Sequence, residues 1–194
     1  VEKGYDEILV LGGDGTLSEA INGIMRANIT PQQRAKITFG LMPRGTGNDF
    51  ARYFGLDKRF KRSLKLFFEG KKEPIDVGCL TYWRNGVEHH RYFINSVGFG
   101  IDSLTNEYGQ HLKYYIGSHH VNYLFGLFGA LIKIKLQQMH LFVDGKSFIN
   151  NKMFHMNIAN GPYNGGGMKQ NAEADPCDGL LDVLIVKKVS RLQV

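Results

Sequence analysis

The sequence predicts an α/β fold, with an α/β part over residues 1–78 and a β-rich part over residues 79–194. Two observations predict the α/β part: an apolar run that ends in a glycine turn and continues as an amphipathic helix occurs at residues 8–24 and again at residues 37–54. A third observation predicts the β-rich part, because short strand patterns dominate from Val77 onward. The chain begins without Met, almost directly on the first strand, so we expect further sequence on both sides of it.

The first glycine turn follows a pattern typical of a buried strand, Ile-Leu-Val-Leu at residues 8–11. Three glycines then flank the carboxylate of Asp14; these are Gly12, Gly13 and Gly15. Thr16 and Glu19 have the spacing of a capping box, which predicts the start of a helix. Glycine N–H groups and the positive end of a helix favour an anion, so we expect phosphate here. The alternative, a turn that needs small residues only for packing, does not explain Asp14, which repels phosphate unless a cation lies between them.

The second glycine turn repeats this design. The strand pattern of residues 37–42 ends in Pro-Arg-Gly-Thr-Gly-Asn-Asp at residues 43–49, and a helix is expected from Phe50 to Phe54. Because the carboxyl ends of neighbouring parallel strands meet at one sheet edge, both turns are expected to face one ligand crevice. Two unrelated loops are the alternative, but both would then carry Gly-Thr and an Asp by coincidence. Neither turn is a P-loop or the dinucleotide fingerprint.

The remaining elements are shorter. Strands are predicted at residues 80–83, 92–97, 141–143, 148–149, 153–159 and 181–186, with hairpin turns at Asn85-Gly86 and Asp144-Gly145. A short amphipathic helix is predicted at residues 63–68 and a helical region at residues 104–136. Within the latter, residues 121–134 are strongly apolar but too few to span a bilayer. They form either a core helix or a surface that contacts an apolar acceptor or lipid.

The composition of the chain limits the classes of partner that it is expected to bind. A chain of 194 residues with 43% hydrophobic and 22% charged residues is typical of a globular protein, and its net charge of +6 suits an anionic partner. Nucleic acid is not expected, because no predicted helix carries a clustered Lys/Arg face. Cys79 and Cys177 do not form a disulfide framework, which favours a reducing cytoplasm. The histidines, as adjacent pairs, lack metal-ligand spacing.

A late loop carries three carboxylates within eight residues, just before the last predicted strand. They belong to Asp175, Asp178 and Asp182. Carboxylate and carbonyl oxygens are the ligands of hard cations, so this loop could hold one. An acidic turn that merely starts the strand explains the same spacing, and the residues alone do not decide between the two.

The two glycine turns resemble the motifs of the diacylglycerol kinase catalytic domain family, in particular soluble bacterial lipid kinases related to sphingosine kinases and NAD kinases. The similarity extends to residues 75–78, 95–100, 160–161, 165–168 and 178–183. It implies an NAD-kinase-like α/β nucleotide domain over residues 1–78, followed by a β-rich, sandwich-like domain over residues 79–194 that takes the lipid acceptor. Two family motifs are absent from the sequence: an Asn-Pro upstream of the first glycine turn, and an Asp-Gly-Glu whose Glu resembles a general base.

The resemblance also implies the ligands and their residues. ATP would be the phosphoryl donor and Mg²⁺ the cofactor, with Asp14, Asp49 and Asp76 as a catalytic acidic network around the metal. The implied nucleotide-binding residues are Gly12, Gly13, Asp14, Gly15, Thr16, Leu17, Ser18, Gly45, Thr46 and Asn48. A separate structural Mg²⁺ would be bound by the side chain of Asp178 and by the backbone carbonyls of Asp175 and Leu180.

The sequence therefore predicts an ATP-dependent lipid kinase that transfers the γ-phosphate to the primary hydroxyl of diacylglycerol or a related lipid. We expect a cytoplasmic protein in peripheral contact with a membrane surface, and a homodimer is left open. The alternatives are an NAD or other small-molecule kinase, or a non-catalytic nucleotide-binding regulatory module, which the absent Asp-Gly-Glu would fit. The 194-residue piece alone is expected to bind nucleotide weakly and turn over poorly.

Overall fold

The computed structural model describes residues 3–101 and 136–187. The predicted helical region, including residues 121–134, therefore lies outside the described residues except at its last position. Two compact units are present: the first comprises Val1–Ser96 and Ala159–Asp182, and the second comprises the remaining residues. The domain boundary predicted near residue 78 stays a prediction.

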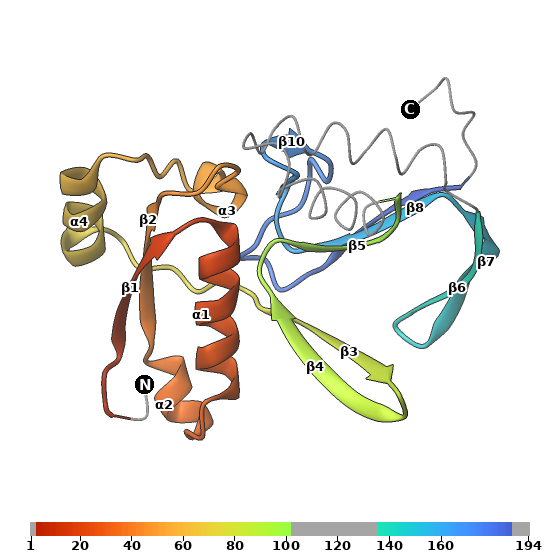
Figure 1. Cartoon of the computed structure of the whole chain (residues 1–194), viewed down its shortest axis with the longest axis horizontal. Coiled ribbons are helices and arrows are strands. Elements are labelled where there is room, and N and C mark those ends of the chain that lie inside the picture. The colour runs from red at the N-terminus through yellow and green to blue at the C-terminus, as the bar shows by residue number, and fades with distance from the viewer. Residues whose placement is uncertain (1–2, 102–135, 188–194) are drawn as a thin grey trace, which may run out of the picture. The chain divides into compact units, whose positions relative to one another are not determined.

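The first unit is built on two parallel strands. Strand β1 (Glu7–Gly12) pairs with β2 (Thr38–Pro43), and the register runs from Glu7 opposite Thr38 to Gly12 opposite Pro43. Helix α1 (Asp14–Arg26) lies on one side of this pair and helix α4 (Phe60–Glu69) on the other (Figure 1). The predicted sequence of strand, glycine turn and helix is thus confirmed, as is the parallel neighbourhood of the two strands.

The core of the first unit follows the two-residue period of β1. Val10 is buried in a cluster with residues of α1, among them Leu17, which is fully buried. On the opposite face, α4 lies so close to β2 that a Cβ atom added to Gly40 would be 2.3 Å from the Phe67 ring. The amphipathic face of α1 and the small residue in β2 therefore fix both helices against the strands.

The helix ends differ from the predicted capping. Helix α1 begins at Asp14, and its N-cap is Gly13, which makes no side-chain capping bond. The predicted Thr16–Glu19 capping box is therefore wrong, because Thr16 already lies within the first turn. A capping box does occur at α2 (Pro31–Ala35), where Thr30 and Gln33 exchange hydrogen bonds.

Two short pairs of strands complete the first unit. Strand β3 (Gly78–Arg84) and strand β4 (Val87–Phe93) form an antiparallel hairpin at the predicted Asn85-Gly86 turn, whose two residues lie in the left-handed region that such a turn requires. The second strand predicted at residues 92–97 is wrong in its bounds, because the strand starts directly after the turn and residues 96–97 belong to a different sheet. The helix α3 (Asp49–Tyr53) follows the second glycine turn. The late loop contributes the two-residue strands β9 (Tyr163–Asn164) and β10 (Met168–Lys169).

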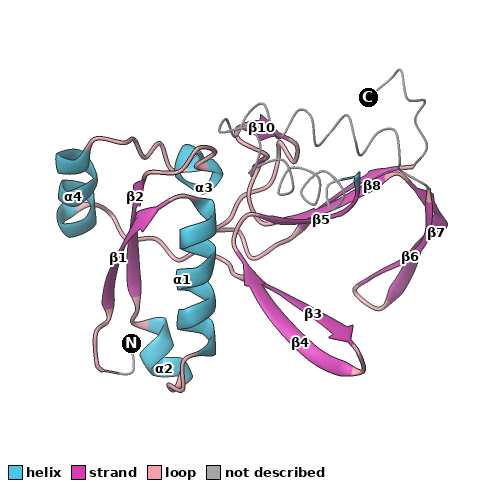
Figure 2. Ribbon diagram, viewed as in Figure 1, coloured by secondary structure: helices cyan, strands magenta, loops and turns pink. Residues whose placement is uncertain are grey.

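The second unit is β-rich in its described part (Figure 2). Its three-stranded sheet has the order β11-β8-β5, where the strands are β5 (Ser96–Gly100), β8 (His155–Ala159) and β11 (Asp182–Val186). A separate hairpin pairs β6 (Gln137–Val143) with β7 (Lys146–Met153) around the predicted Asp144-Gly145 turn. The predicted order of an α/β part followed by a β-rich part is thus confirmed. In the part of the chain that the structure describes, no helix is long and apolar enough to cross a membrane.

Candidate active site

The two glycine turns touch each other at the carboxyl ends of β1 and β2. A Cβ atom added to Gly13 would lie 2.7 Å from the Gly45 Cα, and one added to Gly45 would lie 2.5 Å from the Gly13 Cα. The Arg44 backbone N–H also donates to the Gly12 carbonyl over 2.8 Å. The backbones can approach this closely only because neither turn carries a side chain at the contact.

Asn48 shapes the second turn. Its backbone has a φ of 52°, in the left-handed region, and it is the N-cap residue of α3. Its side-chain oxygen accepts from the Gly45 N–H over 2.8 Å, and its side-chain amide donates to the Gly45 carbonyl over 2.7 Å. The turn is therefore closed by its own side chain, which holds residues 45–48 as one loop.

Asp14 faces the second turn from the start of α1. Its Oδ1 accepts hydrogen bonds from the Phe50 N–H over 3.1 Å and from the Asn95 side-chain amide over 3.3 Å. A Cβ atom added to Gly47 would lie 3.2 Å from the Asp14 Oδ2 and 3.5 Å from the Asp49 Oδ2. Two carboxylates from different elements thus flank one glycine, which concentrates negative charge beside the turns.

Asp49 is the more enclosed of the two, with only 7% of its surface exposed. Its Oδ2 accepts from the Gly166 N–H over 2.9 Å, whereas its buried Oδ1 accepts no hydrogen bond within the described residues. Burial raises the pKa of the Asp49 carboxyl, and the neighbouring Asp14 charge raises it further, while the Gly166 hydrogen bond acts in the opposite direction. A buried carboxylate oxygen without a donor is a suitable position for a cation.

Three consecutive glycines cover this carboxylate. Gly165, Gly166 and Gly167 have φ values of 63°, 88° and 110°, which L-residues with side chains rarely adopt. Arg52 of α3 lies against the last of them: a Cβ atom added to Gly167 would lie 3.1 Å from the guanidinium carbon. The same guanidinium donates to the Gly47 carbonyl over 3.2 Å and lies 5.9 Å from the centre of the Tyr163 ring.

Asp76 makes a different set of contacts. Its Oδ2 accepts from the Gly179 N–H over 2.6 Å, and its backbone N–H donates to the Pro176 carbonyl over 2.7 Å. The buried Asn160 donates its side-chain amide to the Asp76 carbonyl over 2.9 Å. The structure therefore brings Asp14 and Asp49 together at Gly47, and it places Asp76 where its carboxylate holds the late acidic loop.

The carboxylates of the acidic loop, residues 175–182, accept hydrogen bonds that stabilise the loop. The Asp175 Oδ1 accepts from the Tyr53 hydroxyl and from the Cys177 N–H, each over 2.9 Å, and the Asp178 Oδ1 accepts from the Leu180 N–H over 2.9 Å. Within residues 3–101 and 136–187, no three His, Cys, Asp or Glu side chains are grouped to hold a metal ion. The predicted structural Mg²⁺ site uses one carboxylate and two backbone carbonyls, and it stays a prediction.

The other predicted nucleotide-binding residues differ in exposure. Gly15, Thr16 and Thr46 are exposed at the turns, whereas the side chain of Leu17 is fully buried in the core, which leaves only its backbone for a ligand. The Ser18 carbonyl accepts from the Asn22 side chain over 2.8 Å. A groove of about 400 Å³ opens beside the second turn, lined by Pro43, Thr46, Gly47, Asn48, Arg52, Gly55, Leu56 and Lys58.

Sequence patterns do not assign Asn95, Gly166 and Tyr53, which donate hydrogen bonds to acidic side chains. They also do not assign Arg52, which contacts the second turn and the run of three glycines. Asn95 and Gly166 lie in segments that share the family motifs, and the run of three glycines is a signal for backbone that needs positive φ. Tyr53 carries no such local signal, because its partner lies far away in the sequence: the Tyr53 to Asp175 hydrogen bond spans 122 residues. Arg52 has a near partner in Gly47, but its contacts with Tyr163 and Gly167 are also distant in the sequence.

The Tyr53 hydrogen bond gives a prediction for pH-dependent stability. Burial, followed by the bond to Asp175, raises the pKa of the Tyr53 phenol from 10.0 to about 12. A raised pKa means that the bond contributes fully below about pH 10 and that the contribution is lost as the pH rises toward 12. Tyr53→Phe should therefore lower the free energy of unfolding by about 1 kcal/mol at neutral pH. The variant should also lose less of its free energy of unfolding than wild type does as the pH rises above about 10.

Urea denaturation at neutral and alkaline pH measures both effects. The control is Tyr5→Phe, whose ring is 70% exposed, and we expect it to leave the unfolding free energy unchanged. Equal alkaline declines in wild type and Tyr53→Phe would contradict the assignment.

A parallel α/β unit with two glycine turns at one strand edge, followed by a β-rich, sandwich-like part, is the NAD-kinase-like fold class. The family model described as "Diacylglycerol kinase catalytic domain" matches residues 1–80. The family model described as "YegS C-terminal NAD kinase beta sandwich-like domain" matches residues 95–194. The second match alone covers more than half of the chain. The chain therefore belongs to the diacylglycerol kinase family that these two models describe.

Individual proteins that are similar to this chain carry names from the same family. The chain is 31% identical to a diacylglycerol kinase from Mycobacterium tuberculosis (strain ATCC 25618 / H37Rv), across 100% of this chain and 59% of that protein. It is 32% identical to a diacylglycerol kinase from Bacillus subtilis (strain 168), across 96% of this chain and 56% of that protein. A crystal structure of a diacylglycerol kinase from Bacillus anthracis str. Sterne shares the fold, with a TM-score of 0.66 at 24% identity over 97% of this chain and 56% of that one. The chain thus spans less than two thirds of the length of these relatives.

Proposed function

We propose that the full-length protein is an ATP- and Mg²⁺-dependent lipid kinase that transfers the γ-phosphate to the primary hydroxyl of diacylglycerol or a related lipid. One observation carries the proposal: the two glycine turns meet backbone to backbone, and Asp14 and Asp49 flank Gly47 at the contact. Exposed glycine amides beside a helix N-terminus favour phosphate, and paired carboxylates beside phosphate call for a cation. The donor side of a phosphoryl transfer requires both features.

The residues present fit a bound Mg²⁺. Asp49 offers a buried Oδ1 that has no hydrogen-bond donor among the described residues, and Asp14 faces Gly47 with its Oδ2. When bound, the ion would offset the charge on the phosphates. This chain's own residues do the positioning: Asn95 and the Phe50 amide orient the Asp14 carboxylate, and the Gly166 amide orients that of Asp49. Asp76 acts on the acidic loop, where the proposed structural Mg²⁺ would involve Asp178 and the carbonyls of Asp175 and Leu180.

The lipid acceptor implies that the protein works at the cytoplasmic surface of a membrane. The family's relatives are named for a lipid substrate, which supports an acceptor of that class for the full-length protein. The proposed donor site would serve any alcohol acceptor, because its residues are assigned to the ATP phosphates and Mg²⁺ and none to the acceptor.

An acceptor panel tests the proposal. The full-length protein is incubated with γ-labelled ATP and one acceptor, with and without EDTA. The acceptor is diacylglycerol or a sphingoid base in neutral detergent micelles, or NAD in the same buffer. We expect label in diacylglycerol or the sphingoid base, and removal of Mg²⁺ should abolish the transfer. Label in NAD alone would replace the proposal by the small-molecule kinase alternative. Nucleotide binding without transfer to any acceptor would favour the regulatory module.

A further inference from the structure

Helix α4 carries a cluster of basic residues that the sequence prediction missed. The helix was expected over residues 63–68 but begins three residues earlier, at Phe60. This adds Lys61 and Arg62 to the helix, one turn before Lys65. Basic side chains therefore lie on two neighbouring rows of one helix, with Lys61 and Lys65 on one row and Arg62 on the next.

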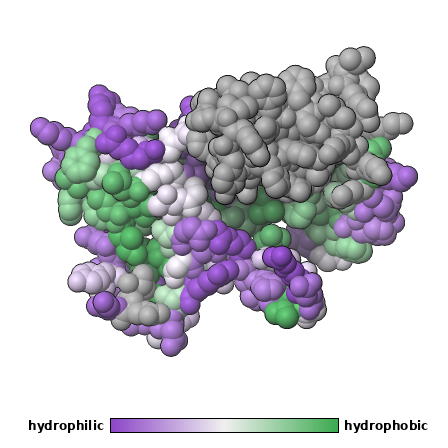
Figure 3. Space-filling view, in the orientation of Figure 1, coloured by the Kyte–Doolittle hydropathy of each residue, from purple (hydrophilic) through white to green (hydrophobic). Residues whose placement is uncertain are grey.

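Apolar residues run beside these lysines. Phe60, Leu64 and Phe68 are spaced four residues apart and form one row along the helix, and Lys61 and Lys65 form the neighbouring row. Phe60 is 53% exposed and Phe68 is 65% exposed. Figure 3 shows hydrophobic and hydrophilic residues side by side over α4. We call these five residues the basic-aromatic face.

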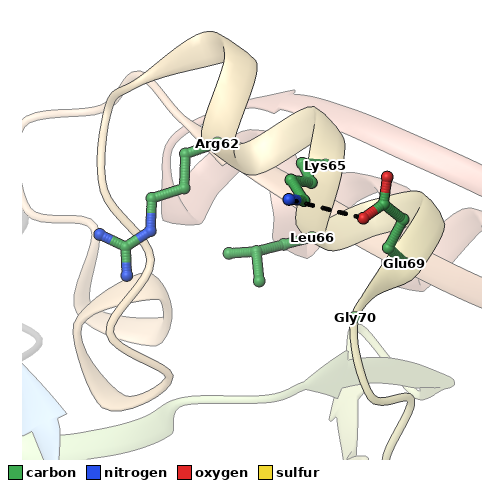
Figure 4. A pocket seen from close by; sticks show the side chains of 5 residues that line it. All are labelled: Arg62, Lys65, Leu66, Glu69 and Gly70. Atoms are coloured by element: carbon green, nitrogen blue, oxygen red, sulfur yellow. Dashed lines mark ion pairs between the residues drawn. The ribbon is translucent and has the colours of Figure 1, made fainter.

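The next row of α4, beside Lys61 and Lys65, also combines apolar and basic side chains. A groove of about 280 Å³ is lined by Arg62, Lys65, Leu66, Glu69 and Gly70. In the close view, the Leu66 and Arg62 side chains extend from the same side of the helix, and Lys65 pairs with Glu69 along its length (Figure 4). Leu66 is 42% exposed, so apolar surface borders the cationic row on both sides.

Basic residues are concentrated in and beside α4. Residues 57–73 contain seven basic residues against three acidic residues, an excess of four. Asp57 is paired with Arg59 and Arg62, and Lys65 and Lys71 are paired with Glu69 and Glu73. Lys61 forms no ion pair within the described part of the chain, and basic residues remain in excess, so an anionic partner is the complement of this surface.

We propose that the basic-aromatic face of α4 binds the surface of a lipid bilayer that contains anionic phospholipid. The inference rests on the proposed function, which requires access to lipid, and it assigns the contact to a particular surface. Basic clusters on an amphipathic helix with exposed Phe and Leu favour a membrane interface, where the rings enter the headgroup region and the lysine stems reach outward. Nucleic acid is the weaker candidate, since stacking on bases requires aromatic rings set along a backbone-tracking groove.

Vesicle flotation of the full-length protein tests the proposal. Wild type should float with vesicles of equal parts phosphatidylcholine and phosphatidylglycerol but not with phosphatidylcholine alone, and high salt should reduce the bound fraction. Lys61→Glu with Lys65→Glu should weaken the partition by about tenfold or more. Phe60→Ser with Phe68→Ser should weaken it by a similar factor, because the apolar contribution is lost.

The β6–β7 hairpin supplies matched controls. Phe142 and Phe148 are 63% and 69% exposed, close to the values of Phe60 and Phe68, and exposed lysines lie beside them. Phe142→Ser with Phe148→Ser, and separately Lys146→Glu with Lys152→Glu, should leave flotation unchanged. Thermal unfolding of every variant shows whether the fold is retained, and the exposed lysine pairs serve if the Phe variants unfold.

Each outcome decides the proposal. Loss of flotation in the α4 variants alone supports it. Unchanged flotation in the α4 lysine variants overturns it, as does loss in the hairpin variants or salt-dependent binding to single-stranded DNA in preference to vesicles. Transfer to diacylglycerol in neutral micelles is measured in parallel: α4 variants should retain it, so a failure of the proposed kinase activity is seen separately from a failure of membrane binding.

Discussion

Asp14→Asn should lower kcat of the full-length protein by about 10²–10³-fold or more while the fold is retained. Asparagine keeps an oxygen in the place of Oδ1, so the Phe50 amide and the Asn95 side chain still have their acceptor. The substitution removes the negative charge and turns the Oδ2 that faces Gly47 into an amide, which cannot serve a cation as a carboxylate does. Because phosphoryl transfer depends on positioning and charge, the chemical step should suffer most.

Steady-state kinetics with varied ATP, Mg²⁺ and acceptor measure this effect. Asp6→Asn is the matched control, since Asp6 is exposed and lies outside the glycine turns, and its kcat should equal that of wild type. Urea denaturation checks that Asp14→Asn remains folded. Turnover within a few-fold of wild type in a folded Asp14→Asn protein would remove Asp14 from the mechanism.

The meeting of the two glycine turns is predictable from sequence for a simple reason. Each turn follows a buried strand, neighbouring parallel strands end at the same sheet edge, and glycines permit backbones to touch. Chain direction and side-chain period thus determine most of the first unit. The start of α4 was less predictable, because the charged residues Lys61 and Arg62 interrupt the apolar period that marks a helix.

The acidic network is only partly visible in the sequence. Its local members follow from the turns, as with Asp49 after the second one. Its long-range contacts do not: Asn95 reaches Asp14 across 81 residues, and Gly179 reaches Asp76 across 103 residues. No local pattern states which distant amide a carboxylate will accept from, so the hydrogen-bond partners of these carboxylates are visible only in the structure, and the predicted network of Asp14, Asp49 and Asp76 around a metal stays a prediction.

The close contact between Gly13 and Gly45 gives the second large effect. Gly13→Ala should lower the free energy of unfolding by about 2–3 kcal/mol, because its Cβ would lie 2.7 Å from the backbone of Gly45, where no flexible side chain can move away. The turns would have to separate, and a displacement near 1 Å at a phosphate site costs about 10²-fold in kcat. Urea denaturation and the micelle kinase assay measure the two losses.

Gly15→Ala is the control within the same motif. A Cβ atom at Gly15 meets nothing within 4 Å, so alanine should leave the unfolding free energy unchanged or raise it by about 0.5–1 kcal/mol, as it does inside helices. Gly45→Ala should resemble Gly13→Ala, because the contact is reciprocal. The double variant should then cost less than the two single losses together, since the turns need to separate only once. Additive losses, or a neutral Gly13→Ala, would show that the turns do not constrain each other.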